Sequence, residues 1–69
     1  MALANMPAEG WLTVNEVARL LGMGVRSVWR MTEDGRLPQP IRLSVKMVRW
    51  DCRTMAAYLK RMREEAEAA

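Results

Sequence analysis

Two short amphipathic stretches on either side of Gly22-Met23-Gly24 constrain the fold of this chain more than any other feature. Two glycines within three residues allow the positive backbone angle that a sharp turn between helices requires. The apolar residues before the turn recur at helical spacing, with Leu20 beside them: Val14, Val17, Ala18 and Leu21. We therefore expect a helix that ends at Gly22 and a second helix that follows Gly24 directly.

The start of the first helix carries a capping signature. Thr13 and Glu16 stand three residues apart, which fits a capping box in which each side chain accepts a hydrogen bond from the other residue's amide. Leu12 before the cap and Val17 at the fourth helical position fit a hydrophobic staple. The sequence therefore predicts that the helix begins immediately after Thr13.

The second helix is expected over residues 25–33, with Asp34-Gly35 stopping it. Arg26, Ser27 and Arg30 fall on one arc of this helix, because residues four apart on a helix lie together. The opposite, inner side is expected to consist of Val25, Val28, Trp29 and Thr32.

The segment after this helix predicts a β-hairpin. Two prolines exclude a helix from Arg36-Leu37-Pro38-Gln39-Pro40. Ile41-Arg42-Leu43 and Val48-Arg49-Trp50 then alternate apolar and basic residues, which is the period of a half-buried strand. Residues 44–47 are expected to form the tip. The apolar strand residues would point inward, and the arginines of the two strands would point outward on the same ribbon: Arg42 and Arg49.

A third helix and two flanking segments complete the organisation. Asp51 is a good N-cap for this helix, whose inner stripe is expected to be Cys52, Met55, Leu59 and Met62. Residues 1–10 show no periodicity and are expected to form a flexible arm. The domain proper would span residues 11–63, and residues 64–69 would form an acidic, fraying end.

Composition excludes several classes of protein. The 69 residues suffice for one domain with a thin core. With no histidine and one cysteine, zinc-finger and disulfide frameworks are excluded, and we expect no metal site and no cofactor. We expect no enzyme, because the chain offers no imidazole base and is too small to enclose a substrate.

The chain also lacks the sequence features of export. No apolar run approaches the ~20 residues of a membrane span, and the opening MALANMPAEG does not resemble a secretory signal. A lone cysteine fits the reducing cytosol. We therefore expect a cytoplasmic protein with no membrane partner.

The net charge of +3 conceals an uneven distribution. All eleven basic residues, most of them arginine, lie between Arg19 and Arg63 together with only three acidic residues, which gives that stretch a formal charge of +8. Both ends of the chain are acidic. A basic middle suits a polyanionic partner, and nucleic acid is the commonest in the cytosol; a solvated surface without a partner is the alternative.

Together the elements predict a mainly α fold with a small β-hairpin, in the order helix, helix, strand, strand, helix. Two short helices joined by a tight turn form a helix-turn-helix unit, and a hairpin after it is a wing. A helix about 10–12 Å across fits the major groove of double-stranded DNA. On the second helix, the residues expected to contact base edges or phosphates are Arg26, Ser27 and Arg30. On the wing, the residues expected to contact phosphates or the minor groove are Arg42, Lys46 and Arg49.

Four segments of the chain together form a pattern: Leu12-Thr13-Val14-x-Glu16-Val17-Ala18-x-Leu20-Leu21-Gly22, Val28-Trp29-Arg30, Asp34-Gly35-Arg36-Leu37-Pro38-x-Pro40-Ile41-Arg42-Leu43, and Val48-x-Trp50 with Tyr58-Leu59. In these segments the sequence resembles the AlpA-like phage regulators and related excisionases, which are small winged-helix proteins similar to the DNA-binding half of MerR regulators. The resemblance covers about residues 11–62. The family usually has Ser or Thr where this chain has Gly24.

The resemblance implies one of two functions. Excisionases, or recombination directionality factors, bind tandem sites at an attachment region, bend the DNA and bias an integrase toward excision. AlpA-type regulators instead bind a promoter. The first implies an integrase as a partner and head-to-tail self-association on DNA. A third alternative, without DNA, is a protein-interaction module that uses exposed methionines and Trp11.

Overall fold

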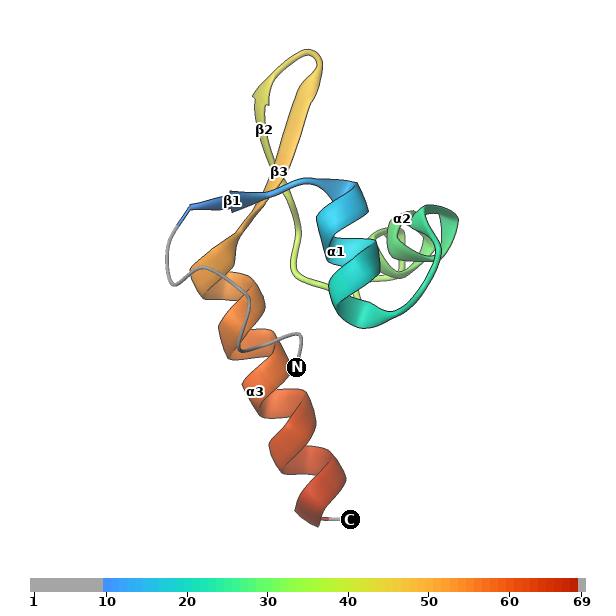
Figure 1. Cartoon of the computed structure of the whole chain (residues 1–69), viewed down its shortest axis with the longest axis vertical. Coiled ribbons are helices and arrows are strands. Elements are labelled where there is room, and N and C mark those ends of the chain that lie inside the picture. Colours follow the sequence, from blue (N-terminus) through green and yellow to red (C-terminus); the bar gives the residue numbers. More distant parts are fainter. Residues whose placement is uncertain (1–9, 69) are drawn as a thin grey trace.

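The computed structural model describes residues 10–68 and contains three helices and a three-stranded antiparallel sheet (Figure 1). In chain order the elements are β1 (Trp11–Leu12), α1 (Val14–Leu21), α2 (Val25–Glu33), β2 (Ile41–Ser44), β3 (Met47–Asp51) and α3 (Cys52–Ala68). This arrangement confirms the winged helix-turn-helix fold. Of the arm expected over residues 1–10, residues 1–9 lie outside the described residues, as does the last residue of the acidic end. Gly10 is described, and its carbonyl accepts a hydrogen bond from the Cys52 amide at 3.0 Å.

The helix-turn-helix unit forms as its local sequence predicts. The Thr13 amide donates to Glu16 Oε1 at 2.8 Å, and the Glu16 amide donates to Thr13 Oγ1 at 3.1 Å, which is the reciprocal capping box. α1 ends at Gly22, whose φ of 69° lies in the left-handed region. The next amide, of Met23, returns to the Ala18 carbonyl at 3.0 Å and closes the helix end.

The sheet contains a strand that the sequence analysis did not anticipate. β1 pairs with the end of β3, with Trp11 opposite Asp51 and Leu12 opposite Trp50, so β3 is the central strand. A two-residue strand is too short to show any periodicity in the sequence. Leu12 is buried by this pairing and fixes the start of the domain to the base of the hairpin.

Trp50 lies at the centre of the core, with 1% of its surface exposed. Its indole Nε1 donates to the Pro38 carbonyl at 2.9 Å, so the ring's single polar group is satisfied inside the protein. The Trp29 ring on α2 lies 5.3 Å away between centroids and is tilted by 48°. The buried residues that make up the core are Leu12, Val17, Ala18, Val28, Leu37, Trp50, Cys52 and Met55.

Several residues expected on inner faces are exposed. Val28 and Thr32 are buried on α2 as expected, but more than a third of Val25 and Trp29 is accessible. The hairpin extends beyond the helices, so Ile41 and Leu43 are each 45% exposed. α3 likewise extends past the core, which leaves Met62 exposed. The inward assignments of Val25, Ile41, Leu43 and Met62 were wrong, because apolar spacing identifies a face but not where the packing partner ends. Trp29 is partly exposed but contacts Trp50, so its inward assignment holds in part.

Cys52 is fully buried at the start of α3, as expected for a small hydrophobic residue. Burial raises the pKa of its thiol, and the negative charges of Asp51 and Glu16 raise it further. The thiol therefore stays protonated and unreactive at neutral pH.

We expect Trp50→Ala to destabilise the domain by ~3–5 kcal/mol, because it empties the centre of a small core. Trp50→Phe keeps much of the volume but leaves the Pro38 carbonyl unpaired, and should cost ~1–3 kcal/mol. Urea unfolding followed by circular dichroism measures both values. Equal stability of Trp50→Ala and the parent chain would show that the packing is misassigned.

Candidate functional site

The outer side of α2 presents the basic residues that the sequence predicted there. Arg26 and Arg30 are exposed, and Ser27 is half-buried at the edge of the same side. The other side of the helix seals the core through Val28 and Thr32, and the Thr32 hydroxyl donates to the Val28 carbonyl at 2.7 Å. One face of α2 is therefore anchored, and the arginine face is open.

The start of α2 is suited to an anion. Its N-cap, Gly24, supplies no side-chain hydrogen bond, and the first turn holds no acidic residue. The first amides of a helix lack partners within the helix and carry the positive end of its dipole. A phosphate placed at this end would meet these free amides, and Arg26 is the second residue of the helix.

The tip of the hairpin presents a second cationic element. The turn consists of Val45 and Lys46, and both side chains are exposed. The Arg42 guanidinium Nη1 donates to the Val45 carbonyl at 3.2 Å. This bond holds the Arg42 charge against the tip, so two cations lie close to the turn.

The register of the hairpin separates the two strand arginines. Ile41 lies opposite Arg49 and Arg42 lies opposite Val48, and residues opposite each other in an antiparallel pair share a face of the sheet. Arg42 and Arg49 therefore lie on opposite faces, and the expectation that they point outward together was wrong. The cause is the irregularity between Arg42 and Ser44, because one extra residue in a strand reverses the face of those beyond it.

The helix that carries the arginines lies on the Arg42 side of the hairpin. Trp50 is two residues from Val48 on β3 and so shares its face, and Trp50 contacts Trp29 of α2. Arg42 consequently lies on the same face of the sheet as α2. Arg49 is on the other face, half-buried, with its guanidinium Nη1 donating to the Val48 carbonyl at 3.0 Å.

Two exposed residues at this surface were not among the predicted contacts. Trp29 is 37% exposed, one helical turn from Arg26, and was expected inside because its spacing matches the core stripe. Val45 is 84% exposed at the tip of the hairpin. The sequence signal for this exposure is the position of Val45 between the two alternating segments, where no neighbouring element covers a hairpin tip.

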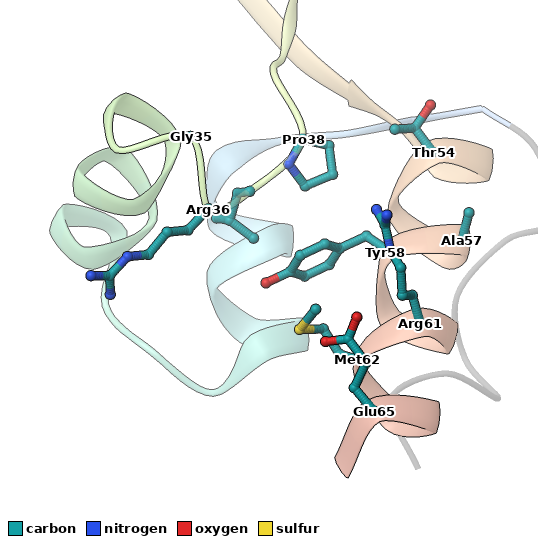
Figure 2. Close-up of a pocket in the computed structure, with 10 residues that line it drawn as sticks. Gly35, Arg36, Pro38, Thr54, Ala57, Tyr58, Arg61, Met62 and Glu65 are labelled. Carbon is teal, nitrogen blue, oxygen red and sulfur yellow. The ribbon is translucent and has the colours of Figure 1, made fainter. Parts of the chain in front are cut away.

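A groove of about 430 Å³ lies away from these residues, between the Gly35–Pro38 segment and α3 (Figure 2). Its apolar lining includes Leu37, Tyr58 and Met62, and Arg61 and Glu65 lie along α3 at its edge. Within residues 10–68 no group of three or more Cys, Asp or Glu residues is placed to hold a metal ion. The groove thus offers an apolar surface with charged edges.

Comparison with known proteins gives one match. A family model described as a helix-turn-helix domain matches residues 11–63, which span β1 to the middle of α3. No curated protein and no solved structure matches the chain. Helix-turn-helix domains place their second helix in the DNA major groove and are typically not enzymes. In the described part of the chain, no helix is both long and apolar enough to cross a membrane.

We expect Gly24→Ser to stabilise the domain by about 0.5–1 kcal/mol. Gly24 has φ −79°, which any residue adopts, and a side chain there meets nothing within 4 Å. Serine would cap the first amides of α2 and restrict the unfolded chain.

Gly22→Ala is the matched comparison, because its site is equally open but its φ of 69° strains any residue with a side chain. It should destabilise by about 1–2 kcal/mol. Urea midpoints measure both changes, and a Gly24→Ser midpoint below that of the parent chain would contradict the assigned cap.

Proposed function

Since this chain belongs to the helix-turn-helix family of AlpA- and excisionase-like small DNA-binding proteins, we propose that it acts as an excisionase. It binds tandem sites at an attachment region, bends the DNA and biases a site-specific integrase toward excision, on the nucleoid in the bacterial cytoplasm. The observation that supports DNA recognition most directly is the open arginine face of α2, on the same side of the sheet as Arg42.

α2 enters the major groove in this proposal. Arg26 and Arg30 each donate to O6 and N7 of a guanine, and each such bidentate pair contributes about 1–3 kcal/mol of discrimination against the wrong base. Ser27, at the edge of this face, donates to a base or a phosphate. The uncapped start of α2 receives a phosphate of the groove wall.

The hairpin lies along the neighbouring backbone. Arg42 and Lys46 bind phosphates at the tip, where the structure holds both charges close to the turn. Arg49 contacts the backbone from the other face of the wing, with a smaller share of its side chain accessible. Phosphate contacts of this kind fix the register of the protein on the duplex and carry no sequence information.

Tandem binding brings neighbouring copies into contact. Residues 61–68 of α3 are exposed, and the acidic ones lie at the opposite end of the long axis from the hairpin (Figure 1). The acidic end of one copy meets the basic surface of the next, a head-to-tail contact that does not close into a ring. The molecule is 40 Å long, comparable to one turn of B-DNA at roughly 34–36 Å.

We expect Arg30→Ala and Lys46→Ala to weaken DNA binding in different ways. Arg30→Ala should cost about 1–3 kcal/mol on the specific site and relax preference at one base pair, with little change on random DNA. Lys46→Ala should weaken binding to both DNAs alike and reduce the slope of log affinity against log salt by about 0.9. Fluorescence anisotropy titrations at several salt concentrations, on a site selected from random sequence, measure these effects. Equal loss from both variants on both DNAs would show that α2 is not the recognition helix.

The family also includes AlpA-type regulators, so the competing function is control of a promoter. An excision assay with a site-specific integrase and its attachment sites, and a promoter reporter without any integrase, separate the two functions. The excisionase proposal predicts that excision depends on this chain and on Arg30, and that the promoter does not respond. A promoter response that survives deletion of the integrase, with excision unchanged, would favour the regulator.

A further inference from the structure

The tip of the hairpin exposes an apolar side chain with cations around it. Val45 is 84% exposed, more than any other large hydrophobic residue in the described part of the chain. Lys46 follows Val45 directly, and the Arg42 guanidinium donates a hydrogen bond to the Val45 carbonyl at 3.2 Å. Because exposed apolar surface is unfavourable in water, this arrangement points to a partner that covers Val45.

The positive charge of the hairpin indicates what kind of partner covers Val45. Residues 41–50 include three basic residues and no acidic one. Ile41 and Leu43 on β2 add apolar surface along the same ribbon. A cationic ribbon with an apolar tip fits a polyanion with an apolar interior, and duplex DNA has this character, with charged phosphates outside and stacked base faces inside.

The dimensions of the minor groove restrict how the tip can bind. The groove is about 6 Å wide, and two paired strands already lie about 4.8 Å apart before side chains are added. Only the two-residue turn enters an undistorted groove. Deeper entry requires the groove to open, and apolar side chains inserted between base pairs open it by unstacking one step and kinking the duplex.

We propose that Val45 is an apolar wedge that inserts into the minor groove next to the α2 site and unstacks one base step. Arg42 and Lys46 hold the phosphates on either side of the opened groove. The inference rests on the proposed DNA binding and adds a residue and a mechanism for the bend. The preferred step is pyrimidine–purine, TA or CA/TG, because these steps unstack most easily.

The test compares Val45→Ser with Met47→Ser on a duplex that carries one selected site. Both residues are exposed on the same hairpin, so both variants should keep the parent chain's melting temperature. Energy transfer between end labels reports the bend. 2-Aminopurine placed at successive steps across the site reports unstacking through its increase in fluorescence.

The parent chain and Met47→Ser should bend the duplex and raise 2-aminopurine fluorescence at one step. Val45→Ser should at least halve both signals, while its affinity falls less than tenfold and its salt slope stays unchanged. Val45→Leu should retain both signals. Replacing the unstacked step by a stiff A-tract should reduce binding of the parent chain more than binding of Val45→Ser.

Two results would overturn the wedge. In the first, Val45→Ser bends and unstacks the site as the parent chain does. In the second, Met47→Ser reduces the bend and the 2-aminopurine signal as much as Val45→Ser does, which would mean that the hairpin acts through general apolar contact. Either result leaves DNA binding by α2 intact, whereas failure of the parent chain to bind any selected duplex would refute the proposed function and the wedge together.

Discussion

The burial of Trp50, on β3, against three other parts of the chain holds this domain together. Its backbone pairs β3 with β1, its indole donates to the carbonyl of Pro38, and its ring contacts Trp29 of α2. A chain of 69 residues has too little interior for a second such centre. The orientation of α2 relative to the hairpin, on which the proposed DNA surface depends, therefore follows from the environment of one side chain.

The irregularity in β2 decides on which face of the hairpin each strand arginine lies. A regular two-residue hairpin around Val45 and Lys46 would pair Arg42 with Arg49 and place both charges on one face. The register shift before Ser44 instead puts Arg42 on the α2 side and leaves Arg49 on the far side. A single extra residue thus decides which arginine faces the same duplex as Arg26 and Arg30 in the proposed complex.

Sequence alone was sufficient where the interaction is local. The capping box of Thr13 and Glu16 and the left-handed Gly22 involve residues within one or two turns, so their pattern predicts their geometry. It was insufficient where the outcome depends on distant partners. The residues near Leu12 give no pattern that predicts its pairing with Trp50. Alternation in the hairpin could not predict that Ile41 extends past the helices into solvent. In the candidate site, Arg26 and Arg30 lie on the outer side of α2 as predicted. Arg42 and Arg49 lie on opposite faces of the hairpin because of a bulge, which the alternation of apolar residues does not predict.

In the proposed complex, the outer side of α2 and the tip of the hairpin contact one duplex together. A nuclear magnetic resonance titration of the nitrogen-15-labelled chain with a single-site duplex tests this geometry residue by residue. We expect the largest amide shifts at Arg26, Ser27, Arg30 and residues 45–46, and small shifts along residues 61–68. Shifts confined to the end of α3, or an unchanged α2 in a saturated complex, would contradict it.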